Sequence, residues 1–116
     1  MRLRNITGSR EVIADSEFVV KEAVLFDCPG TWHDIFGNEN PIHIEIGMGK
    51  GKFIHTMAKE HPDINYVGIE KYSSVLLRAI QKMEEEELPN LKFVRMDAED
   101  ILKVFGRGEV DRIYLN

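Results

Sequence analysis

The sequence has little cysteine, no long apolar run and no surplus of positive charge. Cys28 is the only cysteine, so no disulfide can form within the chain, and a reduced, cytoplasmic setting is expected. No apolar stretch is long enough to cross a bilayer, and the N-terminus lacks the apolar segment of a signal peptide. The net charge of −5 argues against a broadly basic surface that coats nucleic acid.

Several catalytic and metal-binding motifs are also missing. The four histidines show neither H-x-x-x-H nor H-E-x-x-H spacing, so no metal site is expected. No G-x-S-x-G elbow and no cysteine–histidine motif indicates nucleophilic catalysis. No feature of the sequence determines an oligomeric state. What is present, 116 residues with 43% hydrophobic content, fits one small domain with a hydrophobic core.

A change in composition near residues 36–41 divides the chain. Residues 1–41 are predicted to form an N-terminal arm followed by irregular or short helical structure. The first ten residues carry Arg2, Arg4 and Arg10 and no acid. Two interpretations stay open for them: a basic arm that touches phosphate, or an ordinary chain terminus.

Helices and strands alternate regularly from residue 42 onward. Apolar alternation predicts strands, and helical spacing predicts helices, at 42–46, 52–60, 65–70, 73–87, 91–97, 100–105 and 110–116 in the order β-α-β-α-β-α-β. Ser73 or Ser74 is expected to cap the longest helix. An earlier short helix at 31–36, capped by Thr31, is expected to bury Trp32. The alternation predicts an α/β fold with a parallel sheet, whose ligands bind beyond the carboxyl ends of the strands.

A glycine-rich loop follows the first of these strands, in the stretch "HIEIGMGKGKF". A phosphate-binding P-loop requires Ser or Thr after its Gly-Lys pair, where Phe53 stands. A dinucleotide-binding loop requires a third glycine where Lys52 stands. The pattern E-x-G-x-G-x-G fits fully, with Glu45, Gly47, Gly49 and Gly51.

Acids stand at or near the carboxyl ends of the first three predicted strands, and they are Glu45, Glu70 and Asp97. In a parallel sheet these ends share one edge, so the acids are expected to converge. A carboxylate before the loop favours a cationic ligand group. Glu70 is placed to accept hydrogen bonds from ribose hydroxyls, and Asp97 from an adenine amine. S-adenosylmethionine has an amino-acid head, a ribose and an adenine, and would satisfy all three acids.

Residues 42–97 resemble the nucleotide-binding half of the class I S-adenosylmethionine-dependent methyltransferases, which implies a Rossmann-like fold for 42–116. The stretches "FGNENPIHIEIGMGKGKFI", "PDINYVGIEKY" and "GEVDRIYLN" are similar to the bacterial tRNA (guanine-N7-)-methyltransferases. The resemblance implies a cofactor site made by Glu45, Gly47, Gly49, Gly51, Glu70, Asp97 and Ala98. It also implies methyl transfer to N7 of a guanine in the tRNA variable loop.

The sequence departs from that family at its end. In the family the fourth strand continues into a loop with an aspartate, a Pro-Trp-Pro turn and lysines that line the catalytic mouth. This chain ends at Asn116. We therefore expect a sheet truncated after the fourth strand, catalytic residues beyond Asn116, and no methylation by these residues alone. Two other interpretations stay open: a binding domain for another adenosine ligand such as NAD, which Lys52 disfavours, and a non-catalytic interaction module.

Overall fold

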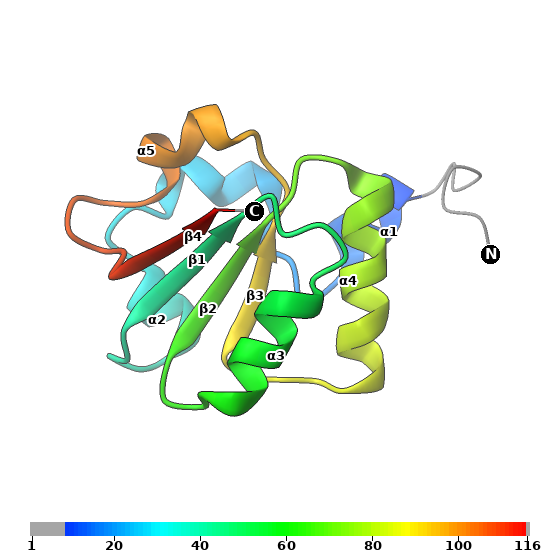
Figure 1. Cartoon of the computed structure of the whole chain (residues 1–116). Coiled ribbons are helices and arrows are strands. Elements are labelled where there is room, and N and C mark those ends of the chain that lie inside the picture. Colours follow the sequence, from blue (N-terminus) through cyan, green and yellow to red (C-terminus); the bar gives the residue numbers. More distant parts are fainter. Residues whose placement is uncertain (1–8, 116) are drawn as a thin grey trace.

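The computed structural model describes residues 9–115 (Figure 1). Arg2 and Arg4 of the predicted basic arm lie outside the described residues. Arg10 is exposed on helix α1 (Ser9–Asp15). The described part therefore shows one of the three arginines of that arm.

Four parallel strands form the sheet, in the order β3-β2-β1-β4. The strands are β1 (Ile42–Ile46), β2 (Asn65–Ile69), β3 (Leu91–Val94) and β4 (Arg112–Leu115). Helices α3 (Lys52–Glu60) and α4 (Ser73–Glu85) connect the first three of them. The predicted parallel α/β sheet is confirmed, with its fourth strand beside the first, although the last two strands are shorter than their patterns predicted.

Helices cover both faces of the sheet (Figure 1). On one face α1, α3 and α4 enclose a core that includes Tyr66 and Phe93. On the other face η2 (Glu22–Asp27), α2 (Trp32–Phe36) and α5 (Ile101–Val104) enclose a second core that includes Val67. Successive strand residues point to opposite faces, so a central parallel strand such as β2 must be apolar on both sides. All five of its residues are buried.

The helix starts differ from the predicted caps. Thr31 occupies the predicted N-cap position of α2, but its hydroxyl donates to the carbonyl of Cys28 and makes no capping hydrogen bond. The predicted cap at Ser73 or Ser74 is wrong, because Tyr72 occupies the N-cap position of α4. The Glu70 carboxylate accepts the Tyr72 N–H and fixes the turn, so helical geometry begins at once. The hydrogen bond from the Tyr72 N–H to the Glu70 side chain therefore sets where α4 begins.

Trp32 anchors the N-terminal segment in the core. It is fully buried, its ring stacks on Phe105 with centroids 4.8 Å apart, and its Nε1 donates to the Val104 carbonyl over 2.9 Å. A buried indole N–H with a partner carries no desolvation penalty. The predicted core position of Trp32 is confirmed.

Strand β4 forms one edge of the sheet and stays largely open. Ile113 and Leu115 are 51% and 79% exposed. Within residues 9–115 no helix combines the length and apolar character needed to cross a membrane. The same residues hold no group of three or more His, Cys, Asp or Glu able to bind a metal ion.

Candidate functional site

A cavity of about 360 Å³ opens at the carboxyl ends of β1, β2 and β3. Its lining comprises Ile46, Gly47, Ile69, Glu70, Lys71, Tyr72, Val75, Met96, Asp97 and Ala98. Most of these side chains are apolar, and two carboxylates stand among them. The cavity therefore suits a flat, largely apolar ligand that carries a few hydrogen-bond donors.

Glu70 connects the glycine loop to the start of α4. The residue is only 7% exposed. Its Oε1 accepts the N–H of Gly49 over 3.0 Å, and its Oε2 accepts the N–H of Tyr72 over 3.1 Å. A carboxylate offers about four lone-pair positions. Each oxygen therefore retains acceptor capacity toward a ligand in the cavity while it holds the loop.

Asp97 shapes the neighbouring wall. It is the N-cap of η3 (Ala98–Asp100), and its Oδ1 accepts the N–H of Glu99 over 3.0 Å. An N-cap aspartate fixes the chain direction at a helix start. This arrangement places Ala98 in the wall of the cavity beside Asp97.

The three loop glycines all adopt left-handed backbone geometry. Gly47, Gly49 and Gly51 have φ angles of 73°, 60° and 79°, a region that other residues enter only with strain. Gly51 has a second reason to lack a side chain, since a Cβ there would lie 2.9 Å from Ala79 Cβ. It lies at the contact between α3 and α4. Of the three glycines, Gly47 lines the cavity.

Glu45 takes a different place from the other two predicted acids. It is 3% exposed, lies in register with Gly68 and Tyr114, and is not among the cavity residues. Among the described residues its Oε1 has no hydrogen-bond partner. Burial raises the pKa of Glu45 to about 7. The structure thus joins Glu70 and Asp97 around one cavity and leaves Glu45 buried with unused acceptor capacity.

Several residues that shape the site escaped the sequence analysis. A side chain at Gly68, in the middle of β2, would collide with Sδ of Met48, a residue of the glycine loop whose side chain is buried. Glycine inside a strand often marks such a close approach, so this signal was available. Val75 and Met96, which form apolar walls, carry no distinguishing pattern. The cavity walls depend on how distant segments pack.

Two curated relatives match along the whole chain. A tRNA (guanine-N(7)-)-methyltransferase of Lachnoclostridium phytofermentans is 63% identical over 116 residues, which make up 100% of this chain and 53% of that protein. A tRNA (guanine-N(7)-)-methyltransferase of Bacillus cytotoxicus is 49% identical over 117 residues, again 100% of this chain and 53% of that protein. The chain thus spans about half the length of these relatives.

The fold also matches solved structures. One, described as the structure of an antibiotic-related methyltransferase, superposes with a TM-score of 0.62 and 25% identity, over 72% of this chain and 43% of that one. Residues 39–116 match the family Methyltransf_4, described as "Putative methyltransferase". The chain belongs to this methyltransferase family.

Proposed function

We propose that this chain is the cofactor-binding part of an S-adenosylmethionine-dependent tRNA (guanine-N7-)-methyltransferase. The observation that carries the proposal is the 63% identity, along the entire chain, to a protein of that name. In this proposal residues 42–116 bind the cofactor, and residues 1–41 form an N-terminal arm followed by an irregular or short helical segment. Transfer RNA is the partner, and the buried free thiol of Cys28 favours a cytoplasmic setting.

The residues of the site fit this cofactor. The apolar walls of the cavity suit an adenine ring, and Asp97 beside them can accept a hydrogen bond from its amine. Glu70 keeps lone pairs that can accept from ribose hydroxyls. Oε1 of Glu45, which has no partner among residues 9–115, is a buried acceptor that a cationic group could satisfy. When bound, S-adenosylmethionine would supply a methyl group on a positively charged sulfur.

The proposed reaction depends mainly on how the methyl donor and guanine N7 are positioned. N7 of guanine has a free lone pair and carries no proton, so its methylation requires no general base. The carboxylates of Glu45, Glu70 and Asp97 therefore serve binding and orientation. Orientation of two bound reactants can supply about 7–11 kcal/mol of a barrier. The glycine loop contributes Gly47 to the wall of the cavity. The Glu70 carboxylate holds this loop in place.

A titration distinguishes this function from binding of NAD. Calorimetry with S-adenosylhomocysteine is expected to show saturable binding, and NAD is expected to show none, because Lys52 stands where a dinucleotide loop has its third glycine. Methyl transfer to an unmodified tRNA transcript by a protein of the relatives' full length, mapped by mass spectrometry, tests the reaction and its position. Binding of NAD without binding of S-adenosylhomocysteine would overturn the proposal.

A further inference from the structure

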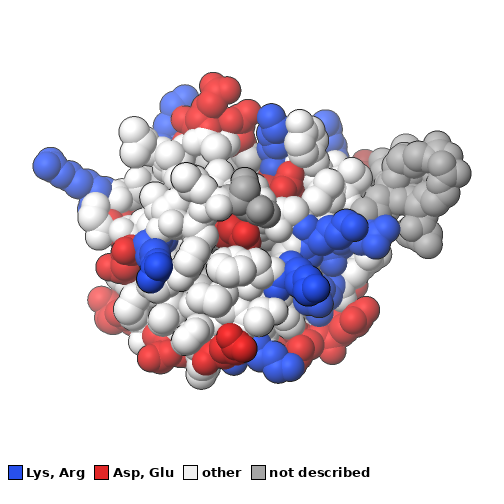
Figure 2. All heavy atoms as spheres, in the orientation of Figure 1, with Lys and Arg blue, Asp and Glu red and all other residues white. Residues whose placement is uncertain are grey.

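A second hollow, of about 510 Å³, lies next to the glycine loop. Its lining consists of Met48, Gly49, Lys50, Lys52, Phe53 and Thr56. Gly47 of the same loop lines the first cavity, so the two spaces share this loop as a wall. Both charged residues of the second hollow are basic, although the chain as a whole has five more acids than bases (20 − 15 = 5). Figure 2 shows basic side chains gathered over the loop and the start of α3.

Four other hollows of the described chain each hold both acidic and basic residues. The one beside the end of β3 includes Glu22, Asp97 and Asp100 together with Lys71 and Arg95. There Arg95 is neutralised by an ion pair with Glu22 at 2.9 Å. The hollow at the glycine loop is therefore set apart by its uniform positive charge.

Lys50 and Lys52 are exposed, and neither takes part in an ion pair within residues 9–115. Their position does not serve the helix, because positive charge is unfavourable near a helix N-terminus and α3 begins at Lys52. The first turn of α3 holds no acid that would offset them. Two unneutralised cations at this place are explained better by an anionic partner than by the stability of α3.

An exposed aromatic ring lies between these lysines and β4. Phe53 is 45% exposed and meets Tyr114 edge-on, with ring centroids 5.2 Å apart. The Arg112 guanidinium lies 5.0 Å from the centre of the Tyr114 ring. A row of cations and rings thus runs from the start of α3 to β4. Bases stack on such rings, and phosphates pair with such cations.

We infer that this surface, formed by Lys50, Lys52 and Phe53, contacts an unpaired segment of the RNA substrate. The two lysines pair with backbone phosphates, and the Phe53 ring stacks against one base. The inference rests on the proposed function, since it places the RNA beside the cofactor cavity.

The test is the binding of an unmodified tRNA transcript to the full chain at several salt concentrations, with the variants Lys50→Ala/Lys52→Ala and Phe53→Leu. The double variant should weaken binding at least tenfold at low salt. It should also reduce the slope of log K against log salt by about 1.4, as expected for two phosphate contacts on a single strand. Phe53→Leu keeps apolar bulk against Tyr114 and should weaken binding about tenfold, through lost stacking, with an unchanged slope.

The matched control is Lys59→Ala/Lys82→Ala, which removes the same charge from the far ends of α3 and α4. Its tRNA affinity should stay within twofold of the parent's. Calorimetry with S-adenosylhomocysteine should give the parent's affinity for every variant. If the parent binds both ligands but Lys50→Ala/Lys52→Ala binds tRNA no worse than the control, the inference about this surface is refuted and the proposed function stands. If that variant loses cofactor affinity instead, the lysines hold the cofactor carboxylate and the inference is wrong. A parent that binds S-adenosylhomocysteine but no tRNA would overturn the inference and leave the cofactor-binding function standing. A parent that binds neither ligand would overturn both.

Discussion

The strands of the parallel sheet begin at one side, here called the amino edge, and end at the other, the carboxyl edge. Asn90 at the amino edge and the acids at the carboxyl edge differ in how fully their hydrogen-bonding groups are used. At the amino edge Asn90, just before β3, directs its Nδ2 toward the carbonyls of Ala58, His61 and Ile64 at 3.0, 3.1 and 2.8 Å. An amide nitrogen has two hydrogens for these three acceptors, so its donors are fully used. At the carboxyl edge Glu45 has an oxygen without a partner among the described residues, and Glu70 has lone pairs to spare.

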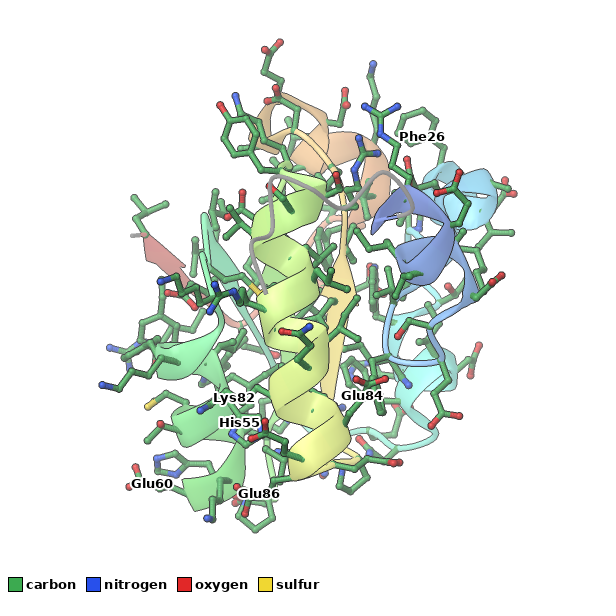
Figure 3. All side chains as sticks on the ribbon, turned by 90° about the vertical axis from the view of Figure 1, so that its right-hand side faces the viewer. Phe26, His55, Glu60, Lys82, Glu84 and Glu86 are labelled. Atoms are coloured by element: carbon green, nitrogen blue, oxygen red, sulfur yellow. The ribbon has the colours of Figure 1, made fainter. Side chains whose placement is uncertain are left out.

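The contact between α3 and α4 also changes along its length. Near the carboxyl edge the two helices approach through Gly51 and Ala79, where no side chain fits at position 51. At the opposite end the buried His55 contacts the Glu86 carbonyl through Nε2 over 2.9 Å, with Lys82 nearby (Figure 3).

The comparison teaches that a fully bonded polar group such as Asn90 stabilises the fold, whereas a carboxylate with spare acceptor capacity beside a cavity is available to a ligand. An unpaired atom alone marks no site, because His43 Nδ1 and Tyr66 Oη, near the amino ends of β1 and β2, also lack partners among the described residues.

Asn90→Leu provides the most severe test of the amino edge. The variant removes both amide donors and takes this partner from the buried Ala58 carbonyl and the partly buried Ile64 carbonyl, at about 1–3 kcal/mol for each orphaned group. The His61 carbonyl still accepts the N–H of Ile64. We expect the free energy of unfolding, measured by urea denaturation, to fall by about 3–5 kcal/mol. Affinity for S-adenosylhomocysteine in the folded fraction should not change. A loss below about 1 kcal/mol would show that these bonds do little for the fold.

Glu45 tests the carboxyl edge through pH. Its pKa is about 7 in the folded protein, against 4.5 for the free side chain, so the unfolded chain loses the proton first as pH rises. Stability contributed by the protonated carboxyl is therefore present below pH 4.5 and is lost as pH approaches 7. The full loss is on the order of 3 kcal/mol.

Comparison with Glu45→Gln isolates this effect. The free energy of unfolding of the parent, minus that of the variant, should decrease between pH 4.5 and pH 7. Chemical denaturation at a series of pH values measures the difference. A difference that does not vary with pH would mean that folding leaves the pKa of Glu45 unshifted, and that burial imposes no cost on its charge.

Glu70→Ala tests whether an acid that holds the loop also binds the ligand. Loss of charge-assisted bonds to ribose hydroxyls should weaken binding of S-adenosylhomocysteine by about 1–3 kcal/mol, as measured by calorimetry. Glu60→Ala removes an equal charge from the exposed far end of α3 and should leave the affinity unchanged. Equal affinities for the two variants would make Glu70 a purely structural residue.

The smallest effect is expected from the exposed ion pair at the amino edge. Lys59 Nζ lies 2.7 Å from Glu86 Oε2, with the two side chains 59% and 47% exposed. The hydrogen bond from Lys59 lowers the pKa of Glu86. In Lys59→Ala this pKa should return toward its usual value in an NMR titration, while the urea midpoint stays the same, because solvent screens such pairs. A clear fall in the midpoint would show that exposed polar groups also stabilise this edge.

Much of the architecture followed from local patterns. Isoleucine-rich alternation marked β1, helical spacing marked α3 with its end at Glu60, and the β-α order implied parallel strands. The end of β3 was placed too late, because the chain leaves the sheet after Val94 while its sequence stays partly apolar through Met96. The start of α4 was misjudged because a carboxylate from outside the helix fixes it.

The sequence alone determined the parallel order, the strand ends that carry acids and the place of the three-glycine loop, because apolar periodicity and glycine spacing are properties of neighbouring residues. Only the tertiary structure decided which hydrogen bonds each of the acids makes. Glu70 meets the N–H of Gly49, and Glu45 finds no partner for Oε1 among the described residues. Val75 and Met96 came to the cavity from separate elements. Burial and hydrogen-bond saturation depend on contacts between distant segments, which only packing establishes.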